Sequence, residues 1–501
     1  MLKQDHTHYQ GFREPGIRMM EPLADSLNSH RSEMVKPKLY AFHLFDKAHL
    51  VMLTEEGLIP RPDGVAMLRA LREMEAEGVD AVRLLGGGGM HSGEPYLIRK
   101  LTEEVGGRIH LGRSSGDLGE VGKRIYARDN LLKVIEMVTT LRKTLIEVAE
   151  NNLDTVMPGY THAQHAQPTT WGHMILSWVS VLERDTDRLL LNFEHVNRSP
   201  AGAAILTGSD FPLNRQRVGD LLGFHSVEKN TYDAILSHDN LFETLSALAI
   251  LHMNLARWCD DLMLYNTSEF GMVSFPDRFC GTSSIMMQKK NAYAPQFIKG
   301  AAARTVGGLM TSFLVEKDPS SVPILDRAYT DQAIIESFEA LIRDVGWVNE
   351  FMPVLKLEKE LMHARSAEYW CQATEVAGAL VRDRGMPWRT AHQIVGILVR
   401  FAEERRIRPL EVTTALLDEA AIAYMGEPAG LSAQSLAASL DPVVAVHRRT
   451  LYGGPAPEEV KLRLHEYRQA LAQDVEQLQA AQRNVAAGLQ RLESAIDALL
   501  A

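Results

Sequence analysis

The chain has 501 residues, enough for several domains, and its 64 acidic and 53 basic residues give a net charge of −11. No dense run of Lys and Arg is present, which argues against nucleic acid as the main partner. The three cysteines are widely spaced and form neither a disulfide framework nor a zinc-ligand pattern, which suits a reducing cytosol. The first residues contain no apolar signal segment, and no run of about eighteen apolar residues is free of charge. We therefore expect a cytoplasmic protein without a membrane partner.

The first 120 residues predict an arm followed by a small helical domain. Residues 1–35 are polar and weakly patterned, and we expect them to form a flexible arm. Residues 36–120 show short helical patterns that are broken by Gly and Pro. The glycine run at residues 86–89 lacks the Gly-Lys-Ser/Thr that completes a phosphate-binding loop, so we expect a flexible turn before a helix there.

The middle of the chain, residues 121–372, predicts a bundle of long helices. Apolar residues recur at three- and four-residue spacing over residues 121–150, 240–262 and 331–356. Alternating β patterns are nearly absent. Long helices with one apolar face pack most simply against one another, and such bundles often assemble across chains. The sequence therefore predicts an all-α fold with a long central helical bundle.

The C-terminal part predicts several shorter helices and then one long one. Residues 373–457 alternate helical patterns with turns rich in Gly and Pro, which predicts a small helical domain. In residues 458–501 apolar side chains recur every seven positions, and Gln482 and Gly488 interrupt this heptad pattern. We expect the amphipathic tail helix to pack on its own chain or on a neighbouring subunit. The alternative is contact with a separate partner.

The segment GTSSIMMQKKNAYAP, residues 281–295, combines groups that suit carboxylate chemistry. Ser283 and Ser284 offer hydroxyls, Lys289 a point charge and Asn291 an amide donor. A serine is ordinarily a poor base, but a nearby ammonium and oriented N–H groups in a closed loop activate it. The apolar residues in the middle of the segment would exclude water. The alternative is a loop with a structural role only.

Two further segments contain candidate groups. PGYTHAQHAQPTT, residues 158–170, places Thr161, His162 and Gln164 in a short turn that we expect to lead into a helix. A histidine in a turn bounded by Gly and Pro is a candidate for acid–base work, although a lone histidine is usually structural. GRSSGD, residues 112–117, opens a long helix. Its side chains either cap that helix or, with its N–H groups, meet an anion.

These segments and several others share their residues with one enzyme family. GTSSIMMQKKNA is similar to the pattern Gly-Ser-Ser-x-Met-Pro-x-Lys-x-Asn-Pro, and GYTHAQHAQP to Gly-Tyr-Thr-His-Leu-Gln-Arg-Ala-Gln-Pro. Further matching stretches are NTYDAILSHDN, ATEVAGALVRDRGMPWRTAH and RRTLYGGPAPEEV. Together they cover about residues 40 to 460. On these motifs the chain is identified as a member of the fumarase/aspartase superfamily that resembles its argininosuccinate lyase branch.

The resemblance implies a fold, an assembly and a reaction. The implied subunit is mostly helical and has three domains, and its long central helices form a twenty-helix core in a homotetramer with shared active sites. The implied reaction is the reversible anti elimination of an amine from an N-substituted aspartate or succinate, which releases fumarate. A base removes the proton next to a carboxylate, the doubly charged intermediate is stabilised, and an acid protonates the leaving nitrogen. The implied partner is a small dicarboxylate, and neither a cofactor nor a metal is required.

The resemblance also implies roles for individual residues. Ser283 matches the catalytic base, Lys289 the group that stabilises the carboxylate, and His162 the proposed acid or acid relay. Other positions within these motifs are predicted to bind substrate: Thr161, Ser284, Asn291, Gln164, Arg113, Ser114, Ser115 and His238. A further group is expected to support the site or contact substrate: Asn230, Asp233 and Ser237. Asp233 also fits a simple ion pair at a helix end.

The sequence departs from the family pattern where substrate should bind. The family's Gly-Arg-Ser-Arg-Asn-Asp reads here Gly-Arg-Ser-Ser-Gly-Asp, so Ser115 and Gly116 replace the Arg and Asn that hold the succinate half. Loss of a charged carboxylate partner typically costs a few kcal/mol. His165 and His238 also stand where the family has Arg, and a family segment with Gln and Lys has no counterpart in residues 312–326.

Three hypotheses follow. The first is a carbon–nitrogen lyase of argininosuccinate lyase type with a different N-substituted dicarboxylate as substrate, because the base, the loop lysine and the Thr-His pair are kept. The second is a catalytically silent homologue that serves as a structural or interaction protein. The third is a genuine argininosuccinate lyase of arginine biosynthesis. Release of fumarate from a panel of substrates would separate them.

Overall fold

The computed structural model describes residues 25–85, 88–317 and 325–501. Most of the predicted arm therefore lies outside the described residues, and so do residues 86 and 87 of the glycine run and part of the segment 312–326. The described end of the arm is a helix, α1 (Asp25–Val35). Within the described ranges, no helix combines the length and the apolar character that crossing a membrane requires.

A group of short helices forms the first apolar core. They are η2 (Lys36–Lys38), α2 (Leu39–Glu55), α3 (Arg61–Glu77), α4 (Val79–Leu85), α5 (Gly93–Lys100), α6 (Glu103–Gly106) and η3 (Gly107–His110). Helix α2 is buried along most of its length, including two charged side chains. Asp46 accepts a hydrogen bond from Arg113 at 2.6 Å, and Lys47 donates to Glu75 at 2.6 Å. These partners offset the cost of burying the charges of α2.

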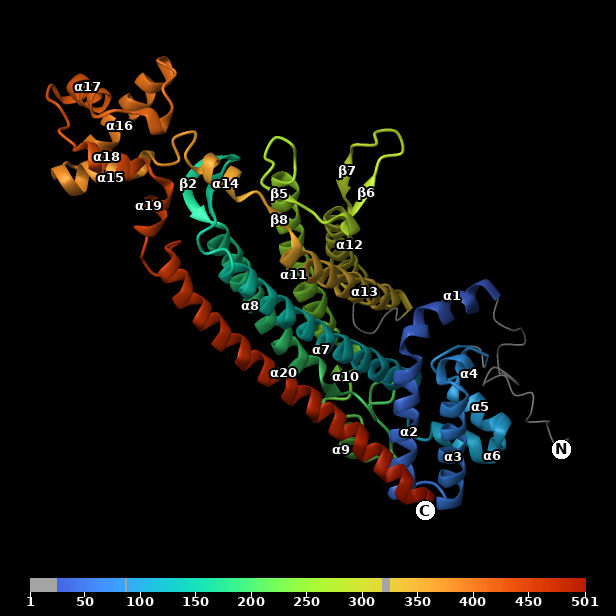
Figure 1. The fold of residues 1–501 in the computed structure, drawn as a ribbon. Helices are drawn as coiled ribbons and strands as arrows, with labels where there is room; N and C mark the ends of the chain where they lie inside the picture. Colours follow the sequence, from blue (N-terminus) through green and yellow to red (C-terminus); the bar gives the residue numbers. More distant parts are fainter. Residues whose placement is uncertain (1–24, 86–87, 318–324) are drawn as a thin grey trace.

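Five long helices form the centre of the subunit (Figure 1). They are α7 (Ser115–Glu150), α8 (Trp171–Val196), α11 (Asp239–Tyr265), α12 (Tyr293–Val315) and α13 (Ala328–Phe351). The predicted apolar stripes meet in one core, in which Ile135, Leu245 and Phe338 are fully buried. Helix α13 ends five residues earlier than predicted, at Phe351, where η6 (Met352–Val354) begins, since its proline cannot continue an α-helix. The prediction of a helical fold with a central bundle is confirmed.

Eight short strands in the described ranges pair as four two-stranded sheets. Three pairs are antiparallel and one, β3 with β4, is parallel: β1 (Val156–Thr161) with β2 (Gln164–Thr170), β3 (Arg198–Ser199) with β4 (Ser226–Val227), β5 (Val273–Ser274) with β8 (Lys356–Leu357), and β6 (Cys280–Thr282) with β7 (Lys290–Ala292). The short turn predicted within residues 158–170 is the turn of the β1–β2 hairpin, and α8 follows it as expected. Pro158 and Pro168 face each other across this hairpin, and neither residue is tolerated inside a helix.

The C-terminal region has its own apolar core, and one long helix then returns along the bundle. The core is formed by α15 (Ala373–Arg384), α16 (Trp388–Glu404), α17 (Thr414–Met425) and α18 (Ala433–Leu440). The preceding helix α14 (Lys359–Ser366) packs on the β1–β2 hairpin, and α19 (Pro442–His447) contacts both α18 and this hairpin. Helix α20 (Pro457–Leu500) runs from this region past α8 and α7 to α2 and α3 (Figure 1). Leu464 and Leu478 pack in the bundle core, whereas Leu492 and Ile496 pack in the first core. The tail helix therefore packs on its own chain, as predicted.

Gly488, which interrupts the heptad pattern, marks a close approach of two backbones. Here α20 crosses the turn after the short helix α9 (Arg215–Leu221). A Cβ atom on Gly488 would lie 2.3 Å from the Cα atom of Gly223. A Cβ atom on Gly223, whose φ is +75°, would lie 2.7 Å from the carbonyl oxygen of Val485. Both positions therefore require glycine.

We expect Gly488→Ala to lower the free energy of unfolding by about 1–3 kcal/mol, because the added methyl group must push α20 away from the bundle. The matched control is Gly396→Ala in α16, where an added Cβ atom meets nothing within 4 Å. This control should gain about 0.5–1 kcal/mol from the lower chain entropy of alanine. Urea unfolding of both variants measures the difference. An unchanged midpoint for Gly488→Ala would contradict the close approach.

Candidate active site

The tip of the β1–β2 hairpin presents three of the predicted residues. Thr161 pairs with Gln164, which leaves His162 and Ala163 as a two-residue turn. Both turn residues have positive φ, 53° and 58°, as in a type I′ turn. Residues other than glycine are strained at positive φ, and such strain is concentrated at functional sites. Thr161, His162 and Gln164 are all exposed at this tip.

The segment GTSSIMMQKKNAYAP, residues 281–295, contains most of a second hairpin, which is formed by β6 and β7. Gly281 faces Asn291 and Thr282 faces Lys290, so residues 283–289 form an exposed tip. The apolar side chains of this tip, which were expected to exclude water, are largely uncovered by their own subunit. Ile285 is 79% and Met287 is 89% exposed. Apolar side chains this exposed indicate a contact outside the subunit or with a ligand.

Ser283 accepts two backbone hydrogen bonds from its own loop. Its Oγ accepts the backbone N–H of Met286 at 3.0 Å and that of Ile285 at 3.3 Å. N–H groups that donate to a hydroxyl oxygen favour its deprotonated form. Of the two loop lysines, Lys290 pairs with Asp277 at 2.6 Å, whereas Lys289 is exposed beside the tip. Two backbone N–H groups of the loop are therefore oriented towards Ser283.

The third predicted group lies at the N-terminus of α7, where it caps the helix. Ser114 is the N-cap residue, and its Oγ accepts the N–H of Gly116 at 3.5 Å. Asp117 accepts the N–H of Ser114 at 2.8 Å, which completes a capping box. Burial raises the pKa of Asp117 to about 6. Of the two roles that the sequence left open for this segment, the structure has the helix cap.

The two positions that depart from the family pattern follow this cap. Ser115 is exposed, and its Oγ lies 2.8 Å from Nε2 of His91. A Cβ atom on Gly116 would lie 2.7 Å from the carbonyl oxygen of Ala204. Any side chain at this position would therefore displace the backbone around residue 204.

Arg113 and His238 are buried in ion pairs. The Arg113 side chain is 1% exposed and its Nη1 lies 2.6 Å from Oδ1 of Asp46. The His238 side chain is 2% exposed, with Nε2 at 3.0 Å from Oε1 of Glu120 and Nδ1 at 2.6 Å from Oε2 of Glu316. Both predicted substrate-binding side chains are therefore paired with carboxylates of their own chain in the described subunit.

The expected supporting residues make local hydrogen bonds around α10 (Asp233–Leu236). Asn230 accepts the N–H groups of Tyr232 at 2.8 Å and of Asp233 at 3.2 Å. Ser237 donates its hydroxyl to Asp233 at 2.5 Å. Asp233 therefore makes hydrogen bonds at a helix end, where the sequence allowed an ion pair. They fix the turn that precedes α11.

One subunit does not bring the three predicted groups together. Helix α7, with 36 residues, is about 54 Å long and separates Ser115 from the β1–β2 hairpin beyond its other end. The two hairpins are separate projections of the subunit (Figure 1). Residues within each group are neighbours, but the three groups lie apart in one subunit.

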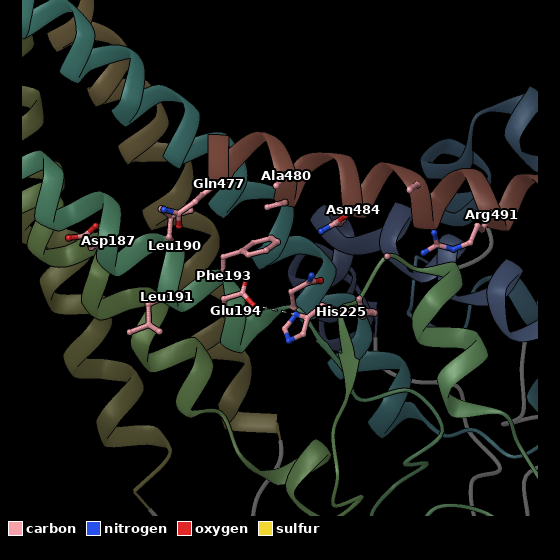
Figure 2. A pocket seen from close by; sticks show the side chains of 15 residues that line it. Asp187, Leu190, Leu191, Phe193, Glu194, His225, Gln477, Ala480, Asn484 and Arg491 are labelled. Carbon is pink, nitrogen blue, oxygen red and sulfur yellow. Dashed lines mark ion pairs between the residues drawn. The ribbon is translucent and has the colours of Figure 1, made fainter. Parts of the chain in front are cut away.

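Two large pockets among the described residues do not bring the groups together either. A groove of about 730 Å³ lies between α8 and α20 and is lined by residues such as Leu190, Phe193 and Asn484 (Figure 2). It contains none of the predicted site residues. A second pocket of about 910 Å³ reaches Tyr160 at the base of the β1–β2 hairpin but not His162. Neither of these two pockets therefore matches the predicted site.

In the described ranges, one set of side chains has the spacing of metal ligands, and the sequence did not indicate it. His91, Glu94 and His110 place one donor atom each within 4.8 Å of one another. Protein groups already contact the donors, since His110 lies 3.0 Å from Glu94 and His91 lies 2.8 Å from Ser115. Burial and the charge of Arg113 lower the pKa of His91 to about 4. The available signal was a His and a Glu three residues apart at a helix start.

Comparisons with known proteins place this geometry in a class. A lyase family model matches residues 74–307, and an argininosuccinate lyase C-terminal model matches residues 370–447. An argininosuccinate lyase of Methanocaldococcus jannaschii is 35% identical over 85% of this chain and 87% of its own length. One of Methanosarcina acetivorans is 35% identical over 91% of this chain and 90% of its own.

Solved structures share the fold. An EDDS lyase variant with bound fumarate has a TM-score of 0.86 and 29% identity, and the match covers 96% of this chain and 97% of that chain. A 3-carboxy-cis,cis-muconate lactonizing enzyme of Pseudomonas putida has a TM-score of 0.68 and 19% identity, with 86% and 95% covered. The second likeness concerns the fold alone.

The helical bundle, the two exposed hairpins and these matches define a carbon–nitrogen lyase of the fumarase/aspartase type. Within that class, the chain belongs to the argininosuccinate lyase family. The resemblance read from the sequence motifs is confirmed at this level.

Proposed function

We propose that the protein eliminates an amine from an N-substituted aspartate or succinate other than argininosuccinate and releases fumarate. The N-terminus of α7 carries this proposal. The family's Arg and Asn are replaced there by Ser115 and Gly116, and a Cβ atom at position 116 would lie 2.7 Å from the Ala204 carbonyl oxygen. Because this obstacle is backbone, movement of side chains alone could not make room for the family's Asn at position 116. A relative named EDDS lyase supports a wider range of amines for this fold.

The two hairpins supply the proposed chemistry. Ser283 takes the proton next to the substrate carboxylate, and the N–H groups of Ile285 and Met286 stabilise its alkoxide. Lys289, with Ser284 and Asn291, stabilises the doubly charged carboxylate that follows. At the other tip, Thr161 and Gln164 bind substrate and His162 handles the proton of the leaving nitrogen. No cofactor takes part in these steps.

We further propose a homotetramer with shared sites. The bundle exposes large apolar side chains on three of its helices: Ile250 and Met253 of α11, Phe297, Met310 and Phe313 of α12, and Tyr329 of α13. Apolar surface of this kind marks a protein interface. Four copies of the five long helices would give the twenty-helix core that the family resemblance implies. In such an assembly, the three separated groups of different subunits can meet.

Fumarate release, followed by its ultraviolet absorbance, tests the proposed reaction. The panel contains argininosuccinate, EDDS and aspartates that carry other N-substituents, and the reverse reaction uses fumarate with a set of amines. We expect turnover of at least one N-substituted aspartate and none of argininosuccinate. Efficient turnover of argininosuccinate would refute the interpretation of Ser115 and Gly116. If no substrate is turned over in either direction, the result would favour a catalytically silent homologue.

A further inference from the structure

Six ionisable side chains from separate elements meet at the start of α11. They are Lys38 of η2, Glu120 and Lys123 of α7, His238, Glu316 at the end of α12, and Asp331 of α13. His238 lies 3.0 Å from Glu120 and 2.6 Å from Glu316. Lys123 lies 2.8 Å from Glu120 and 3.6 Å from Asp331, and Lys38 lies 2.6 Å from Asp331. The side chains are only 2% to 15% exposed.

The charges of this cluster balance only when His238 carries a proton. Three carboxylates face two ammonium groups, so a neutral His238 would leave one negative charge without a partner. An unpaired buried charge is costly. The family pattern has Arg at this position, and an Arg is always charged. In this chain the third cation is therefore one that pH can remove.

The hydrogen bonds of His238 lead to the same conclusion. Its two ring nitrogens each contact a carboxylate, Nε2 that of Glu120 and Nδ1 that of Glu316. A protonated imidazole donates from both nitrogens, whereas a neutral one donates from one and turns a lone pair towards the other carboxylate. Burial opposes the charged form, but the two carboxylates outweigh it and raise the pKa of His238 above 6.5.

We propose that His238 is a positioning residue that, while protonated, fastens residues 230–238 to α7 and α12 and so keeps the substrate-binding end of α7 in place. Glu120 lies five residues after Ser115 on α7, which connects the cluster to that end of the helix. When the proton leaves to solvent, one of the two bonds becomes repulsive and the fastening loosens. The role towards substrate rests on the proposed function, whereas the proton on His238 does not.

The kinetic test compares three proteins across pH 6 to 10 with a substrate that the panel identifies. For the natural chain, we expect kcat/KM to fall by up to about tenfold per pH unit above the pKa of His238, through a rise in KM with kcat nearly constant. His238→Arg should lose this dependence. The matched control is His195→Gln, which removes an exposed histidine 2.6 Å from Glu243 and should leave the profile unchanged. An identical alkaline fall in His238→Arg would overturn the proposal.

A second measurement needs no turnover. Because the folded-state pKa lies above the unfolded value, the contribution of His238 to stability is complete below pH 6.5 and is lost as pH rises through the folded pKa. Urea unfolding at pH 6 and pH 9 should show this loss in the natural chain. His238→Gln, which cannot be charged, should show a smaller difference between the two pH values. An NMR spectrum with a neutral His238 at pH 6 would overturn the proposal, even if Arg does not fit at this position.

Discussion

Ser283→Ala is expected to reduce kcat for fumarate release by at least about 10³-fold, because the alanine variant has no group to accept the proton next to the carboxylate. The loop itself should survive the change. The N–H groups of Ile285 and Met286 that lose their acceptor lie at an exposed tip, where water can replace the hydroxyl. Affinity for fumarate should therefore stay within about tenfold of the natural value. Single-turnover kinetics and a fumarate titration measure the two quantities.

Ser284→Ala is the comparison variant, since it removes the same atom from the neighbouring residue of the same loop. We expect it to raise KM and to retain measurable turnover, because a binding hydroxyl is lost and the base remains. The assignment of Ser283 fails if its alanine variant keeps a tenth or more of the natural kcat. It also fails if the two variants lose activity equally.

Two inactive variants are expected to restore activity when their subunits are mixed. Ser283→Ala damages the β6–β7 hairpin and His162→Asn damages the β1–β2 hairpin, and the two hairpins are separate projections of one subunit (Figure 1). If a site takes each hairpin from a different subunit, random assembly of equal amounts gives about a quarter of sites with both natural hairpins. Fumarate release after joint unfolding and refolding measures this fraction.

Each variant refolded alone is the control and should stay inactive. A mixture of Ser283→Ala with Lys289→Met is the sharper one, because both changes lie in the same hairpin. In that mixture every hairpin carries one defect, so no site regains activity. Recovery of activity in both mixtures would contradict sites that are shared between subunits. So would the absence of recovery in both mixtures, provided that assemblies containing both variants have formed.

The bundle could be predicted because its signal is local and repeated. Residues such as Ile135 and Phe338 recur at helical spacing and are buried where that spacing places them. The β1–β2 hairpin gave no such signal. Its turn residues, His162 and Ala163, are not the Asn-Gly type that marks a type I′ turn, and Pro158 opposite Pro168 breaks the strand pattern. Tertiary contacts override weak local preference in this segment.

The candidate site could likewise be predicted only in part. Ser283 and Lys289 could be predicted because they lie close together in one sequence motif. The partners of Arg113 and His238 were not predictable, since Asp46 lies 67 positions from Arg113 and Glu316 lies 78 positions from His238. Only the fold shows that these two cations are already paired. For the same reason, the sequence could not show that Ala204 fills the space beside Gly116.

Helix α20 has a consequence for how the chain is made. Leu492, Ile496 and Leu499 belong to the apolar core of the first helices, although they follow α2 by more than 400 residues and are synthesised that much later. While translation continues, α2 and α3 have left the ribosome but lack part of the surface that covers them. The core of α2 and α3 is thus completed only after the bundle and the C-terminal helical core have been synthesised. A premature stop codon at position 492 would damage the core of α2 and α3 and leave the C-terminal helical core intact.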